Sequence, residues 1–241
     1  MFSTRHLKRP LFPFVCNGEY FEREAEIDSQ STHPLHTLAT GFDVLHRILP
    51  SKEAVELQEV FTDLARYTLE IDDFVMGRPQ ALTLRTLANK RNSTQHNLMS
   101  KCPEVTEVID VLCESLYSAC WHAAVIYSLI SVFPMAHWNA PFAILSQRLK
   151  SHISSTMIQA RWHEMPALML WITTLGAISA FGLGERSWYI SVLERLTNRL
   201  NMHSWHEMKI ELEKFLWYDN ISSSDGHTLW KEIKNSSPFS G

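Results

Sequence analysis

The stretch that decides the fold is PALMLWITTLGAISAFGLGERSWYISVLERLTNRLNMHSWHEMKIELEKFLWYDNISSSDGHTLW, which runs from Pro166 to Trp230. Proline is favoured in the first turn of a helix, and the apolar run that follows predicts a helix ending at Gly182-Leu183-Gly184. A second helix is expected from Glu185 onward, because apolar residues then recur at three- and four-residue spacing. The stretch therefore predicts successive packed helices.

A third helix within this stretch is expected to begin at Ser204, with Glu207 three residues later. In such a capping box, the Ser hydroxyl and the Glu carboxylate each accept a hydrogen bond from an amide that the helix itself leaves unpaired. Farther on, the polar segment from Asp219 to Gly226 predicts a loop, and a short last helix is expected around Leu229 to Ile233.

The sequence before Pro166 predicts four further helices. One begins at Ser51, and the others are expected at about Gln80–Ser100, from Pro103 onward and from Asn139 onward. The apolar stripe of the first helix consists of Leu57, Val60, Phe61, Leu64, Tyr67 and Ile71. No segment alternates at period two between turn residues, so the chain is predicted to be all-α, an irregular multi-helix bundle. We expect an irregular lead-in over 1–37, one helical domain over 38–233 and a flexible tail over 234–241.

Charge and cysteine content exclude several classes of function. The chain of 241 residues has a formal net charge of −4, and Arg5, Lys8 and Arg9 form its only basic cluster. Since a protein that binds duplex phosphates needs a concentrated positive surface, direct nucleic-acid binding by this chain alone is not expected. The four cysteines show no two-residue-gap spacing of the kind that zinc and redox sites use, and no cofactor is expected.

Two segments without charged residues, Ser115 to Gln147 and Met165 to Gly184, are long enough to test for a membrane span. Pro134 and Pro141 interrupt the first, and the second contains several Thr, Ser and Gly residues. Buried core helices are therefore expected, and no membrane association. Nothing after Met1 resembles a signal peptide, so a nuclear or cytoplasmic location is expected.

Two groups of residues suggest chemistry, and each also has a structural interpretation. His203 and His206 lie three residues apart, but the capping box explains this region without a metal. Asp72-Asp73 and Asn220 with Ser224 imitate the two magnesium-binding patches of all-α isoprenoid cyclases. Met76 and Thr228 stand where that pattern needs further carboxylates, so a solvated helix end and a polar turn are the preferred interpretations.

Several separated blocks resemble the C-terminal regulatory domain of fungal-specific transcription factors. In chain order the blocks are Arg91-Asn92-Ser93 with Gln95-His96-Asn97-Leu98, Ala123 to Pro134 ending in Val132-Phe133-Pro134, Pro166 to Trp171 with Gly176, Glu185-Arg186-Ser187-Trp188-Tyr189, Ser204 to Lys209, Phe215-Leu216-Trp217, and Gly226 with Leu229-Trp230-Lys231-Glu232. The resemblance covers about 81–233. Seven blocks in the family's order are hard to obtain by chance.

The resemblance implies structural roles and no catalysis for these residues: Trp and Leu fill the core, and Glu185-Arg186 form a pair at a helix start. The motif residues are Arg91, Gln95, His96, Pro134, Pro166, Trp171, Glu185, Arg186, Trp188, Trp205, Trp217, Gly226 and Trp230. The family contacts DNA through six cysteines that bind two zinc ions. This chain departs from the family, because its first hundred residues contain only Cys16.

We therefore expect a transcription-regulatory module of fungal type that lacks its own DNA-binding zinc cluster. It is expected to act through a protein partner, through a second copy of itself or by sensing a small molecule, with a link to secondary metabolism. The alternative is a helical enzyme of fungal secondary metabolism that acts on a hydrophobic, isoprenoid-like substrate in a pocket lined by Trp and Phe.

Overall fold

The structure of the chain is a computed structural model that describes residues 37–103, 111–132, 139–155, 158 and 161–236. Most of the expected lead-in, Cys16 and the motif residue Pro134 lie outside the described residues. The described residues form helices and no strand, which confirms the all-α prediction. The helices are η1 Thr40–Val44, α2 Leu45–Ile48, α3 Ser51–Val75, α4 Leu84–Ser100, α5 Val111–Tyr127, η2 Ser128–Val132, α6 Asn139–Ile153, η3 Trp162–Glu164, α8 Pro166–Ser179, α9 Arg186–Arg199, α10 Trp205–Glu213 and α11 Asp219–Ser236.

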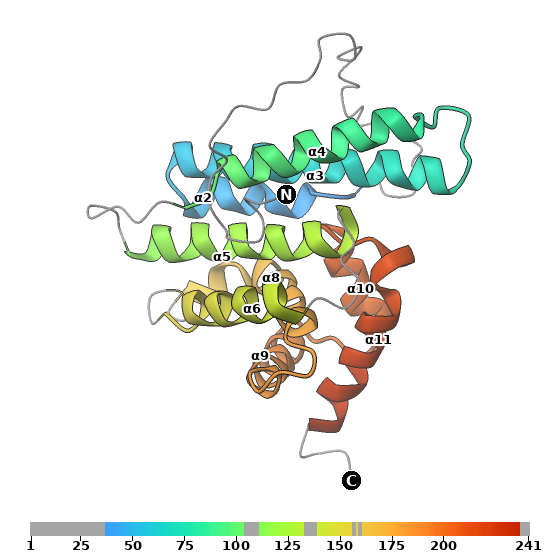
Figure 1. Ribbon diagram of the computed structural model, residues 1–241. Helices are drawn as coiled ribbons and strands as arrows, with labels where there is room; N and C mark the ends of the chain where they lie inside the picture. The colour runs from blue at the N-terminus through green and yellow to red at the C-terminus, as the bar shows by residue number, and fades with distance from the viewer. Residues whose placement is uncertain (1–36, 104–110, 133–138, 156–157, 159–160, 237–241) are drawn as a thin grey trace.

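The helices are arranged in layers (Figure 1). The antiparallel hairpin of α3 and α4 forms one outer layer, and α5 lies directly beneath it. Helices α6 and α8 pack on the other side of α5, followed by α9, while α10 and α11 flank the layers at one end. Helix α5 therefore lies between two helical layers, which explains why most of its side chains are buried.

The centre of the core is the α8 helix, whose Trp171 is fully buried. The indole Nε1 of Trp171 donates a hydrogen bond to the carbonyl of Leu216 at 2.8 Å. The ring of Phe42 stacks on Phe61 with centroids 3.7 Å apart, and it meets Trp171 edge-on at 5.0 Å. Aromatic pairs of this geometry add to the gain from burial, so η1, α3 and α8 are joined at one point.

One helical segment of the described chain, Cys113–Val132, is long and apolar enough to cross a membrane by length and composition. Within the fold, 89% of this segment is buried against other helices. Burial of this extent is typical of the central helix of a layered all-α fold. The arrangement therefore favours the prediction of a buried core helix here.

The predicted loop from Asp219 to Gly226 is wrong, because these residues begin the continuous helix α11. The same helix continues through Ser236, so residues 234–236, which were expected in the flexible tail, are helical. Gly226 suggests a break when only the sequence is considered. In the fold its missing side chain leaves room for two indole rings, since a Cβ at this position would lie 2.2 Å from Cη2 of Trp205.

Candidate functional site

The motif residues of the C-terminal half form an aromatic cluster that joins α8, α10 and α11. Trp205 and Trp217 are buried and meet edge-on with ring centroids 5.7 Å apart. Gly226 lies against both indoles. Trp171 donates a hydrogen bond to the carbonyl of Leu216, in the segment that follows α10. Pro166 is the first residue of α8, as expected of a helix-starting proline. These residues hold the helices together through buried ring contacts and one hydrogen bond.

Glu185 and Arg186 do not form the expected pair with each other; each bridges to a different helix. Glu185 accepts a hydrogen bond from the Ser146 hydroxyl of α6 at 2.7 Å. Arg186 donates two hydrogen bonds to the Glu232 carboxylate of α11, at 2.8 and 2.9 Å, and a third to the Ala177 carbonyl. A bidentate pair of this kind is both strong and directional. The two adjacent residues thus fix the start of α9 against three neighbouring helices.

The remaining motif residues lie at the edges of the helical layers. On α4, Gln95 is buried, whereas Arg91 and His96 are half-buried. The indoles of Trp188 and Trp230 are half-buried, with the ammonium groups of Lys150 and Lys234 over them at 5.4 and 4.5 Å. Not every motif Trp therefore fills the core. These two cover the apolar edge and present a face to a cation.

Asp72 and Asp73 at the end of α3 are engaged in ion pairs. Arg78 contacts Asp72 at 2.8 Å and Asp73 at 2.6 Å, and Tyr218 donates a hydrogen bond to Asp72 at 3.0 Å. The hydrogen bond with Asp73 raises the pKa of the Arg78 guanidinium, which remains charged. Magnesium binding by these carboxylates would require breaking both ion pairs. Ser224, of the second patch, is exposed on α11, and the side chain of Asn220 lies outside what the structure describes.

The capping box at the start of α10 is confirmed. The Glu207 amide donates to the Ser204 hydroxyl at 3.2 Å, and the His203 amide donates to the Glu207 carboxylate at 2.6 Å. These bonds lower the pKa of Glu207, whose ionised form accepts them. His203 and His206 are both exposed. Within the described ranges, no three His, Cys, Asp or Glu side chains are arranged to hold a metal ion.

An open groove of about 370 Å³ runs along the outer face of α3 and α4. Its lining side chains include Gln58, Glu59, Asp63 and Arg66 from α3 and Asn97 from α4, although most of the surface that they present to the groove is apolar. The Asn97 amide donates to the Asp63 carboxylate at 2.6 Å and so ties the two helices together across the groove floor. Small-molecule sites typically enclose most of the ligand's surface, so the open shape of this groove fits poorly with capture of a small effector.

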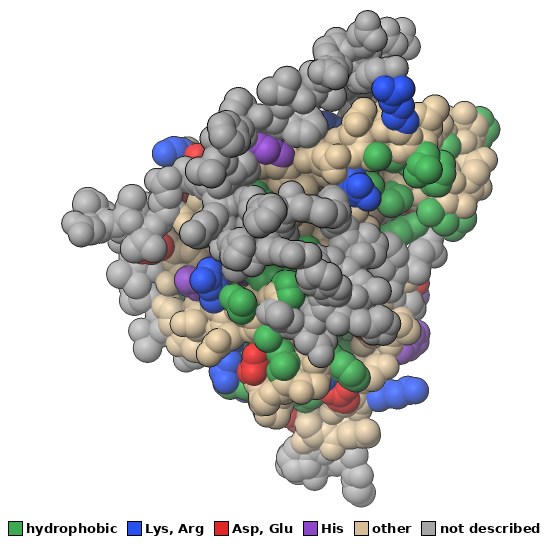
Figure 2. Space-filling model, in the orientation of Figure 1, with side chains coloured by type: hydrophobic (Ala, Val, Ile, Leu, Met, Phe, Trp, Pro, Cys, Tyr) green, Lys and Arg blue, Asp and Glu red, His purple; other side chains and the backbone are tan. Residues whose placement is uncertain are grey.

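The surface feature that sequence reasoning missed is an apolar tip on the α3–α4 hairpin. We define the α3–α4 tip as Phe74, Val75, Met76 and Leu84, which are half of the large hydrophobic side chains exposed in the described part of the chain. Val75 is 62% and Leu84 70% exposed. Figure 2 shows hydrophobic side chains gathered at this end of the hairpin, which projects past the end of α5 in Figure 1.

The turn that carries the α3–α4 tip is fixed in place. Arg78 and Gln80, which follow the end of α3, both donate to the Asp73 carboxylate, and Gly77 has a φ of 62° that suits glycine. The Thr83 hydroxyl caps α4 by accepting the Thr86 amide. A turn with this many bonds holds the exposed apolar side chains in a defined arrangement.

The signal for the α3–α4 tip is present in the sequence. Phe74 and Val75 follow Ile71 by three and four residues, so they continue the apolar stripe of α3 by one turn. Only the fold reveals that none of the described helices covers this last turn. A comparison with family models, curated proteins and solved structures finds no match to the chain. The resemblance to the fungal regulatory domain therefore stays a prediction from the motif blocks.

Proposed function

We propose that this chain is a transcription-regulatory module of fungal type, that it acts through protein contacts, and that the α3–α4 tip is its contact surface. The observation that carries the proposal is a cluster of exposed apolar side chains on a turn that Arg78 and Asp73 fix. The regulatory class is inferred from the ordered motif blocks. Burial of Trp171, Trp205 and Trp217 agrees with the structural role that the resemblance implies for them.

The chemistry of the α3–α4 tip favours a protein partner. Clustered exposed apolar side chains on a soluble fold are unfavourable in water, and such clusters often mark protein–protein contacts. Phenylalanine and methionine are enriched in interfaces relative to the rest of a protein surface. The partner is either a second copy of this chain or another regulator. The net charge of −4 supports indirect rather than direct contact with DNA.

The proposal is tested by complementation in the source organism. Deletion of the gene is expected to change the transcript levels of a defined gene set, and the wild-type chain is expected to restore them. A tip variant with Val75→Asp and Leu84→Asp should leave the gene set unrestored, because two charges would have to be desolvated in the contact. RNA sequencing after each replacement is the measurement.

The matched control is Ile210→Asp, which places the same charge on an exposed apolar position of α10, remote in sequence from the tip. It should restore the gene set as the wild type does, and all variants should unfold at similar temperatures. A deletion without transcriptional effect contradicts the regulatory function. Full restoration by the tip variant contradicts only the proposal that the α3–α4 tip is the contact surface, and leaves the regulatory function standing. Light scattering of wild type and tip variant distinguishes a second copy from a different partner.

A further inference from the structure

The α5–α6 interface contains two imidazole rings side by side, in a place that the proposed function does not use. His122 of α5 is only 4% exposed, and His152 near the end of α6 is half-buried. Their ring centroids lie 5.2 Å apart with the planes tilted by 36°. Since one ring is deep in the interface and the other reaches toward solvent, the pair connects the interior with the surface.

The hydrogen bonding of His122 fixes which ring nitrogen carries the proton. Nδ1 lies 2.7 Å from the carbonyl oxygen of Ser118, one turn earlier in α5. A carbonyl can only accept, so Nδ1 is the donor and Nε2 carries a lone pair in the neutral ring. That Nε2 is buried and has no hydrogen-bond partner in the described part of the chain. Metal-ligating histidines usually have this arrangement, in which one nitrogen donates to a carbonyl and the other is left for the metal.

We propose that His122 and His152 together bind a divalent transition-metal ion of the zinc or copper type, with Nε2 of His122 as the inner ligand. Two imidazoles bound at about 2.0–2.1 Å to one tetrahedral ion place their ring centroids about 5 Å apart. The observed centroid separation of 5.2 Å agrees with this distance. Imidazole nitrogen is a preferred ligand of these ions, whereas magnesium and calcium select oxygen.

Burial of both rings favours the neutral imidazole, which is the form that binds a metal. Burial lowers the pKa of His122 to about 4, and burial also lowers the pKa of His152. Neutral imidazole is the ligand form, so no proton has to be displaced from Nε2 before the ion binds. Protonation of a histidine competes with the metal only in acidic solution.

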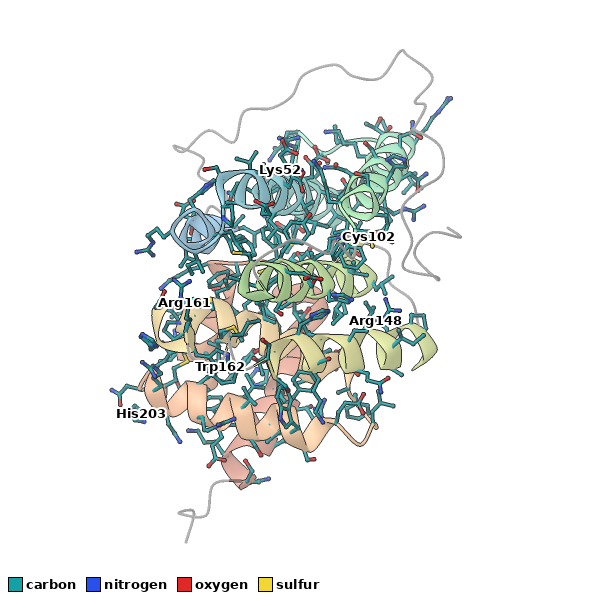
Figure 3. All side chains as sticks on the ribbon, turned by 90° about the vertical axis from the view of Figure 1, so that its left-hand side faces the viewer. Lys52, Cys102, Arg148, Arg161, Trp162 and His203 are labelled. Carbon is teal, nitrogen blue, oxygen red and sulfur yellow. The ribbon has the colours of Figure 1, made fainter. Side chains whose placement is uncertain are left out.

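Two charged side chains near the two histidines would have opposite effects on the binding of a cation. Glu114, two turns before His122 on α5, raises the pKa of His152 and would favour a bound cation. Arg148, which projects from α6 (Figure 3), lowers the pKa of both histidines and would oppose it. The two protein ligands are fewer than the three or four that catalytic and structural zinc sites have. We expect an affinity weaker than that of closed four-ligand sites.

The test is a titration of the purified full chain with Zn²⁺ alone at pH 7.5, in which isothermal titration calorimetry measures the binding affinity. The wild type should show one site that is tighter than any other, and His152→Gln should weaken it at least tenfold. Glu114→Gln should weaken binding about threefold and Arg148→Gln should tighten it, by removal of a unit charge near the ion. The control His163→Gln removes an exposed imidazole and should change nothing.

A second measurement does not depend on how well the variants fold. In nitrogen NMR spectra of the wild type, Zn²⁺ should shift the Nε2 resonance of His122 and leave its Nδ1 in the protonated range. If saturating Zn²⁺ does not shift the Nε2 resonance, His122 does not bind the ion and the proposal is wrong. It is also overturned if His152→Gln and His163→Gln bind Zn²⁺ equally well, because the binding then comes from surface histidines.

Discussion

The aromatic cluster between α8, α10 and α11 and the α3–α4 tip differ in what covers their apolar side chains. In the cluster, Trp205 and Trp217 are buried against each other over the bare backbone of Gly226. At the tip, Val75 and Leu84 are well over half exposed, although their part of the hairpin is equally regular. The same apolar periodicity in the sequence therefore leads to a core in one place and to a surface in the other.

This difference separates the residues that stabilise the fold from those of the proposed contact surface. Removal of a side chain from the cluster leaves a cavity and breaks contacts among several helices. A polar substitution at the tip removes apolar area that already faces water, so the folded state loses little. The comparison predicts that damage to the cluster unfolds the chain, whereas damage to the tip leaves the fold intact and weakens the contact with a partner.

The largest effect is expected for Trp171→Ala, which removes a fully buried indole at the centre of the core. Substitutions of this kind cost about 3–5 kcal/mol in the free energy of unfolding. The Leu216 carbonyl also loses its donor. Urea unfolding followed by circular dichroism measures the change. Trp171→Phe, which keeps a ring in place, should cost clearly less; a loss below about 1 kcal/mol for Trp171→Ala would show that this part of the core is not tightly packed.

The helices of the cluster could be predicted from the sequence because their ends have local chemical signals. Pro166 at the first turn of α8, Gly182 with φ of 74° after its end, and the Ser204 capping box act within a few residues of themselves. The start of α11 was missed for the opposite reason. Gly226 has the local signature of a break, but its role is to make room for indoles that come from other parts of the chain.

The candidate sites depend on distances between segments, which no local pattern encodes. Phe74 and Val75 continue the stripe of α3, and their exposure depends on where α5 ends in space. The pair of His122 and His152 is thirty positions apart in the sequence, and only the antiparallel packing of α5 on α6 brings the rings together. Sequence reasoning examined His203 and His206 because they were neighbours, and the structure places both on the surface.

An intermediate effect is expected for Gly226→Ala, which tests how closely the cluster is packed. A new Cβ would lie 2.2 Å from Trp205 and 3.0 Å from Trp217, so an indole must move. Overpacking costs about 1–3 kcal/mol, from which the better helix propensity of alanine returns up to about 1 kcal/mol. Gly184→Ala is the matched control, because nothing lies within 4 Å of its Cβ position. Equal thermal unfolding midpoints for the two variants would contradict the close packing of α11 on the indoles.

The smallest effect is expected for Leu84→Ala at the α3–α4 tip, and Leu87→Ala one turn later on α4 is its partner experiment. Leu84 is 70% exposed and Leu87 3% exposed, although both leucines belong to one helix. Leu84→Ala should change the free energy of unfolding by less than about 0.5 kcal/mol, while Leu87→Ala should cost about 2–5 kcal/mol. Urea unfolding of both variants decides the matter. A similar loss for both would mean that the tip is part of the core, and its apolar side chains would then not be available to a partner.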